Sequence, residues 1–154
     1  MRQLGSLVMI VIIVFGIGFV ASLFKPDAWF EFLEKPSWSL EQQWMAPLWS
    51  INFALISISS WLVWTRRGVS RESVTAWWLL GIQLGLVVAW SFVLYSEKSL
   101  GLAVLCALGL GLAVLMNVVY FEKNSRAAAG LLLPYLLWTG YIGVFSVSLY
   151  WLNR

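Results

Sequence analysis

The sequence predicts an all-α integral membrane protein, a five-transmembrane-helix bundle with one larger loop after the first helix. Of its 154 residues, 61% are hydrophobic and 11% are charged, and the mean hydropathy is +0.84. A soluble domain has about half apolar and about a quarter charged residues. The charges are confined to the chain ends and short gaps, which leaves five uncharged stretches. At about 1.5 Å of rise per residue, each stretch can cross a hydrocarbon core roughly 30 Å thick.

We expect a single membrane domain over residues 1–154, with an outer loop at 25–44. The five spans are expected at about 3–24, 45–65, 73–96, 99–121 and 127–151. The first span is longer than the hydrophobic region of a signal peptide, so we expect a retained helix. Only Glu97 and Lys98 separate the third and fourth spans, which predicts a tight antiparallel hairpin. Pro47 is expected in the opening turn of the second span, and Pro134 inside the fifth, where it should kink the helix or free a carbonyl.

Lysine and arginine predict the orientation of the chain, because cytoplasmic loops carry an excess of both. One side of the membrane would hold Arg2, Arg66, Arg67, Arg71, Lys123 and Arg126. The other side would hold Lys25, Lys35, Lys98 and Arg154. This bias predicts a cytoplasmic N-terminus and an outward C-terminus. Because helical bundles with long apolar spans normally insert there, we expect the inner membrane of a bacterial cell.

The residue types that the chain lacks argue against several classes of function. There is no histidine, the commonest general base and a frequent metal ligand. The single cysteine, Cys106, cannot form an internal disulfide. No charged residue lies within a span, whereas ion-coupled transporters usually place such groups there. We therefore expect no metal and no cofactor, and we disfavour ion-coupled transport. Without a basic stripe outside the membrane, we also expect no nucleic-acid partner.

The 11 tryptophans are only partly explained by a belt of indole rings at the membrane surface, because Trp90 and Trp138 lie deeper in their spans. Helical spacing places three groups on single helix faces: Trp49, Asn52 and Phe53; Gln83, Val87 and Trp90; and Trp138, Tyr141 and Phe145. These faces fit either the packed centre of the bundle or a cavity in which a few amides among aromatic rings orient a ligand.

The first loop mixes large apolar side chains with charged ones. Residues 25–41 read KPDAWFEFLEKPSWSLE, and a purely solvated loop would not carry so many large apolar groups. The segment is expected either to lie on the lipid surface or to fold back as a lid over a pocket. Lys25 and Lys35 would then meet an anionic group of a ligand, although the acidic residues nearby offset their charge.

Two rows of small residues predict close helix contacts, because helices in lipid associate through small side chains at four-residue spacing. The rows are Gly81, Gly85 and Ala89 in the third span, and Ala103, Ala107 and Gly111 in the fourth. Packing within the bundle and the seam of a homodimer are both consistent with these rows.

Five short motifs follow one another in a distinctive order: Lys35-Pro36-Ser37-Trp38, Pro47-Leu48-Trp49, Trp90-Ser91, Leu132-Leu133-Pro134-Tyr135-Leu136-Leu137-Trp138 and Leu152-Asn153. In these motifs the whole chain resembles the tryptophan-rich sensory protein family, whose mitochondrial members are called translocator protein or peripheral benzodiazepine receptor. The chain departs from the family at four places. Ser39-Leu40 stand where the family has two prolines, and Val87 stands where it has an asparagine. Ile142 replaces an alanine, and Phe145-Ser146 replace a Leu-Asn pair. Bulk at Ile142 would narrow the family's pocket, and the lost amides would remove hydrogen-bond partners.

The resemblance implies a pocket near the first loop that binds porphyrins and, in some members, sterols or synthetic isoquinolines and benzodiazepines. The pocket residues that it implies are Trp49, Phe53, Gln83, Trp90, Tyr135, Trp138, Tyr141 and Ile142, under a lid that contains Trp29 and Trp38. Some bacterial relatives are proposed to degrade protoporphyrin in light. The resemblance gives that catalytic role to Trp49 and Trp138.

We interpret the chain as a membrane receptor or sensor that binds a hydrophobic ligand, a porphyrin, in an intramembrane pocket under the first loop. Light-dependent degradation of the porphyrin is a secondary activity in this interpretation. The alternative is a facilitator or transporter of lipophilic molecules, a porphyrin or a sterol, across the membrane, and a scaffold for membrane partners is a third interpretation. The expected partners are the lipophilic ligand, membrane lipid and a second copy in a homodimer.

Overall fold

The computed structural model describes residues 2–71 and 73–154, and every regular element in these ranges is a helix. The helices are α1 (Arg2–Ser22), α2 (Ala28–Phe32), α3 (Gln42–Arg67), α4 (Val74–Tyr95), α5 (Leu100–Asn124) and α6 (Arg126–Leu152). All except α2 are long and apolar enough to cross a membrane. The predicted fold class, a bundle of five transmembrane helices, is confirmed.

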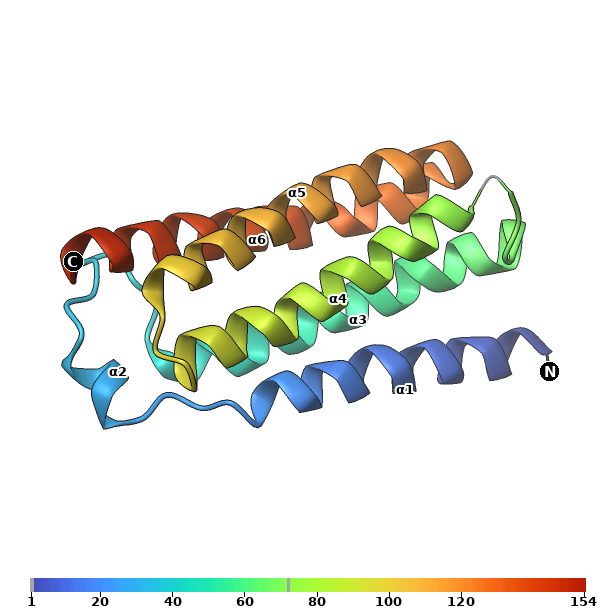
Figure 1. The fold of residues 1–154 in the computed structure, drawn as a ribbon. Helices are drawn as coiled ribbons and strands as arrows, with labels where there is room; N and C mark the ends of the chain where they lie inside the picture. The colour runs from blue at the N-terminus through green and yellow to red at the C-terminus, as the bar shows by residue number, and fades with distance from the viewer. Residues whose placement is uncertain (1, 72) are drawn as a thin grey trace.

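The five long helices form a closed ring. α1 packs against α3 and α4, α3 packs against α6, and α5 packs against both α4 and α6. The order around the ring is therefore α1, α3, α6, α5, α4. Figure 1 shows α5 and α6 along one side of the bundle and α1 along the opposite side. α1 is the least buried span, since 17% of its apolar window lies inside the bundle, against 33% to 50% for the other four.

Loop one, residues 23–41, joins α1 to α3 and contains the short helix α2, which the sequence did not predict because five residues are too few to show a helical period. The side chain of Asp27 caps α2 by accepting a hydrogen bond from the backbone N–H of Phe30 (3.3 Å). α3 then begins at Gln42, slightly before the expected span, so Pro47 lies in its second turn and not in the opening turn. Pro134 lies inside α6, which remains a single helix.

The other connections near the membrane surfaces are short. Residues 96–99 join α4 to α5 as expected for a tight hairpin, and Lys98 lies in the left-handed backbone region with a φ of 54°. Ser125 alone separates α5 from α6. Its hydroxyl caps α6 by accepting a hydrogen bond from the N–H of Ala128 (3.3 Å). The α4–α5 and α5–α6 pairs are thus held antiparallel by connections of only a few residues.

The two rows of small residues have different surroundings. Ala103 and Ala107 of α5 are each 1% exposed, so this row packs within the bundle. Gly81 and Gly85 of α4 are exposed, and a Cβ built on either would meet no atom within 4 Å. No other helix of the bundle therefore covers Gly81 and Gly85. A homodimer contact on this face of α4 stays a prediction.

One interhelical hydrogen bond offers a test of the packing between α3 and α6. The Ser59 hydroxyl donates to the carbonyl oxygen of Ala128 (2.6 Å), whereas the Ser57 hydroxyl donates to Phe53 within α3 itself (2.8 Å). Both serines are fully buried. We predict that Ser59→Ala lowers the free energy of unfolding by about 1 kcal/mol. Ser57→Ala should lower the free energy of unfolding by less, because the Ser57 hydrogen bond lies within α3. Thermal unfolding of both variants in detergent measures which substitution is the more destabilising.

Candidate ligand-binding site

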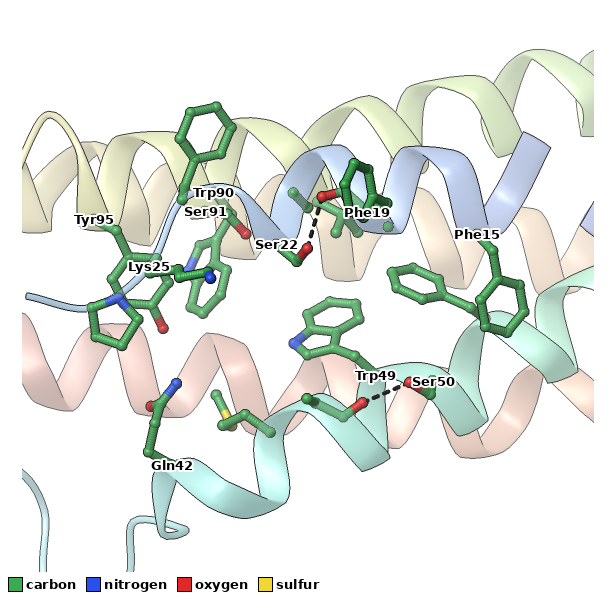
Figure 2. A pocket seen from close by; sticks show the side chains of 18 residues that line it. Phe15, Phe19, Ser22, Lys25, Gln42, Trp49, Ser50, Trp90, Ser91 and Tyr95 are labelled. Atoms are coloured by element: carbon green, nitrogen blue, oxygen red, sulfur yellow. Dashed lines mark hydrogen bonds between the residues drawn. The ribbon is translucent and has the colours of Figure 1, made fainter. Parts of the chain in front are cut away.

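A cavity of about 510 Å³ lies between α1, α3 and α4, at the end of the bundle that carries loop one. Figure 2 shows its lining side chains from close by. Its lining is mostly apolar, and its large aromatic members are Phe15, Phe19, Phe24, Trp49, Phe53, Trp90 and Tyr95. The volume falls within the roughly 300–1,000 Å³ that small-molecule sites occupy.

The cavity opens between α1 and α3. Apart from Lys25 of loop one, the lining residues that remain exposed lie on these two neighbouring helices, among them Phe19 and Ser22 on α1 and Ala46 and Ser50 on α3. Lining residues on α4 are more enclosed, and Trp90 is 1% exposed. In a bilayer the gap between α1 and α3 faces lipid, so a lipid-soluble molecule can reach the cavity from the side.

Aromatic contacts hold the walls of the cavity in place. The rings of Trp49 and Phe53 are stacked, with centroids 5.5 Å apart and planes 27° apart. Phe15 of α1 meets Phe53 edge to face at 6.0 Å. On α4, the indole N–H of Trp90 donates to the Ser146 hydroxyl (3.0 Å). Ser146 therefore provides a hydrogen-bond partner that orients the Trp90 indole.

The predicted pocket residues fall into three groups. Trp49, Phe53 and Trp90 line the cavity. Trp138 and Tyr135 of α6 lie behind Trp49, with ring centroids 5.9 Å and 6.4 Å from it, and neither lines the cavity. The remaining three predicted residues in the spans, Gln83, Tyr141 and Ile142, also lie outside its lining.

The position of α6 in the ring explains why its aromatic residues lie outside the lining. α6 packs on the far side of α3 from α1, so Trp49 stands between α6 and the cavity. Ile142 is fully buried and does not line this cavity, so the expectation that its bulk narrows the family's pocket stays a prediction. Gln83 is likewise fully buried, and neither atom of its amide has a hydrogen-bond partner among the described residues.

The contribution of α1 was missed by the sequence interpretation. Phe15, Gly18, Phe19 and Ser22 line the cavity at intervals of three and four residues, so one side of the first span forms a wall. This spacing was visible in the sequence. It did not reveal which other helices α1 packs against, so nothing connected it to Trp49 or Trp90.

Loop one covers a second cavity, of about 290 Å³, next to the first. Gln42 and Met45 line both cavities, and Tyr141 lines the second. The two lid tryptophans line neither cavity. Trp38 meets the Tyr141 ring edge to face at 5.7 Å, and Trp29 is partly buried with the Lys98 ammonium 5.7 Å from its centroid. The loop residues that line the second cavity are Phe30, Glu31, Lys35, Ser39, Leu40 and Glu41.

Polar contacts fasten loop one to the bundle at three places. The Lys98 ammonium binds the Asp27 carboxylate at 2.7 Å. The backbone N–H and C=O of Glu34 both bind the side-chain amide of Asn153 at 2.9 Å, and the Leu40 N–H donates to the Tyr141 hydroxyl (2.9 Å). The hydrogen bond from Lys98 holds the pKa of Asp27 below its usual value, so the carboxylate is ionised at neutral pH.

A model of the TspO/MBR family matches residues 9–152. The chain belongs to the TspO/MBR family. It is 27% identical to the tryptophan-rich protein TspO of Bacillus cereus, over 96% of this chain and 97% of that protein. It is 30% identical to the uncharacterized membrane protein YtaB of Bacillus subtilis, over 99% of this chain and 98% of that protein.

The similarity extends to mammalian TspO/MBR proteins. The chain is 28% identical to the translocator protein of Bos taurus, over 82% of this chain and 75% of that protein. The family resemblance inferred from the motifs is therefore confirmed, and this TspO/MBR chain is an integral membrane protein. The assignment of individual ligand contacts within the family, Trp49 and Trp138 included, stays a prediction.

Gly18 provides a test of the cavity wall. A Cβ added at Gly18 would lie within 3.0 Å of three atoms of the Phe53 ring, which is 7% exposed and wedged between Trp49 and Phe15. We predict that Gly18→Ala lowers the free energy of unfolding by about 1–3 kcal/mol, because the buried ring has little room to move. Thermal unfolding in detergent measures the loss.

Gly16→Ala is the matched control on the same helix, because a Cβ at Gly16 meets nothing within 4 Å. Its effect should be neutral or stabilising by up to about 1 kcal/mol, since alanine favours a helix over glycine. Equal effects of the two substitutions would contradict the predicted contact between Gly18 and Phe53.

Proposed function

We propose that this TspO/MBR protein is a receptor or sensor that binds a porphyrin in the cavity between α1, α3 and α4. The observation that carries the proposal is the stacked pair of Trp49 and Phe53 on one wall of an apolar cavity of about 510 Å³. A flat conjugated ligand gains most from such a wall, because stacked or edge-to-face aromatic contacts contribute about 0.5–1.5 kcal/mol beyond the burial of apolar area. The opening toward lipid suits a ligand that partitions into membranes.

Titration with protoporphyrin IX tests the proposal. Purified protein in a non-ionic detergent should bind the porphyrin saturably, seen as quenching of tryptophan fluorescence and as a shift of the porphyrin absorption band. We predict that Trp49→Phe weakens binding about threefold or more, because Trp49 lines the cavity. Trp138→Phe should weaken it less, since Trp138 acts through its contact with Trp49. The double variant should be the weakest binder.

Affinity and not the extent of quenching is the quantity to compare, since each substitution also removes a fluorophore. Trp78→Phe is the control, because Trp78 is 71% exposed and lies near the end of α4 opposite to the cavity. If the wild type shows no saturable binding, the proposed function is wrong. If the double variant binds as the wild type does, these two residues do not form the site.

Light-dependent degradation of the bound porphyrin is the secondary activity of this proposal. Trp49 places an indole, which can donate an electron to an excited porphyrin, in the cavity wall. Under illumination in air, the wild type should bleach protoporphyrin IX faster than detergent alone does, and the Trp49→Phe, Trp138→Phe double variant should lose that excess rate. Equal bleaching rates with and without the protein would rule out the enzymatic role.

The location of the cavity favours a receptor over a facilitator. The half of the bundle away from loop one is filled by side chains with 0% exposure, among them Val63, Ala76, Phe121 and Ala128. A facilitator that passes its cargo through the centre of the bundle would need a path through this half. The uneven distribution of lysine and arginine between the two ends supports the proposed orientation, with a cytoplasmic N-terminus in a bacterial inner membrane and the cavity in the outer half.

A further inference from the structure

The charged, amide and phenol groups of the cavity lie at one end. Figure 2 shows Lys25, Gln42 and Tyr95 at the end nearest loop one, and Phe15 at the opposite end. Lys25 is the single charged residue among those that line the cavity. Its long aliphatic stem can follow the apolar wall while the ammonium group stays at the level of the lipid headgroups. A ligand with one polar end would therefore fit this cavity in one direction.

Lys25 differs from the other cations at this end of the bundle, because each of the others has a partner. Lys35 lies 3.6 Å from the Glu31 carboxylate, Lys98 lies 2.7 Å from Asp27, and Arg154 lies over the Trp151 ring at 3.4 Å. Within the described residues, Lys25 has no ion pair, hydrogen bond or aromatic contact of its side chain. Its charge is therefore available to a ligand.

None of the four carboxylates of loop one forms an ion pair with Lys25. The carboxylates of Asp27 and Glu31 are bound by Lys98 and Lys35. The Glu41 carboxylate accepts a hydrogen bond from Gln43, and the backbone of Glu34 is tied to Asn153 at the end of α6. The sequence had suggested that these acids offset both loop lysines. In the structure Glu31 pairs with Lys35, Asp27 pairs with Lys98, and no carboxylate among the described residues pairs with Lys25.

We propose that Lys25 binds a carboxylate of the ligand, so that the cavity selects an amphipathic anion whose apolar body lies against Trp49 and Phe53. Charge-assisted hydrogen bonds between an ammonium and a carboxylate are stronger than neutral ones. This inference rests on the proposed function and specifies its ligand class. A neutral ligand of the same shape would bind more weakly, because it leaves the ammonium without a partner.

A cycle of two proteins and two ligands isolates this contact. Wild type and Lys25→Gln are each titrated with protoporphyrin IX, which carries two carboxylates, and with its uncharged dimethyl ester, in a non-ionic detergent at low salt. We expect Lys25→Gln to weaken binding of the acid about fivefold and to leave binding of the ester unchanged. The preference of the wild type for the acid should shrink as salt is added.

Two further variants separate the contact from general effects of charge. Lys25→Arg should keep the preference for the acid, because it keeps the charge. Arg154→Gln removes one positive charge at the same end of the bundle without touching either cavity, and it should also keep the preference. Equal losses for acid and ester in Lys25→Gln, or no loss for either, would overturn the inference while leaving porphyrin binding intact. Absence of saturable binding of either ligand to wild type would instead refute the proposed function.

A phospholipid headgroup is the other anion that could reach Lys25. The titrations of wild type are therefore repeated with phosphatidylglycerol added to the detergent, and in parallel with phosphatidylcholine. Persistence of the acid preference in both lipids supports a ligand carboxylate at Lys25. Loss of the preference with phosphatidylglycerol alone would assign the ammonium to a lipid headgroup and overturn the inference.

Discussion

Helices in lipid must associate without the hydrophobic drive that collapses a soluble protein, and this constraint governs the bundle. The α4, α5 and α6 helices meet it with small residues and short connections, such as Ala103, Ala107 and the single residue Ser125 between two spans. α3 is joined to α6 by the Ser59 hydrogen bond and by the rings around Trp49. α1 has fewer such contacts, and the cavity lies along this less buried helix.

Trp49 separates two parts of the molecule that sequence reasoning had merged. On one side its ring belongs to the cavity wall with Phe53, and on the other it contacts Trp138 and Tyr135 in the packed core. The aromatic residues of α6 therefore support the cavity without entering it. Ser146 has a similar supporting role, because its hydroxyl orients the Trp90 indole from behind.

The distribution of charge was enough to predict five spans, the α4–α5 hairpin and the larger loop, because a bilayer excludes charge over a known length. Helical spacing was enough to place Trp49, Phe53 and Trp90 on inward faces. Spacing does not say which helices are neighbours, so it could not connect Phe15 and Gly18 to Trp49, and it left the face of Trp138 consistent with either the packed centre or a cavity. The pairing of Lys35 with Glu31, which sets Lys25 apart, also depends on the helix α2, whose five residues leave no periodic signal.

The low burial of α1 has a thermodynamic consequence. A molecule in the cavity contacts α1, α3 and α4 together, so its binding and the attachment of α1 to the bundle are linked equilibria. Whatever free energy the ligand contributes by bridging these helices also opposes detachment of the first helix. Occupancy of the site would thereby raise the free energy needed to detach α1 from the bundle. Such a response to the ligand needs no movement of the other four helices.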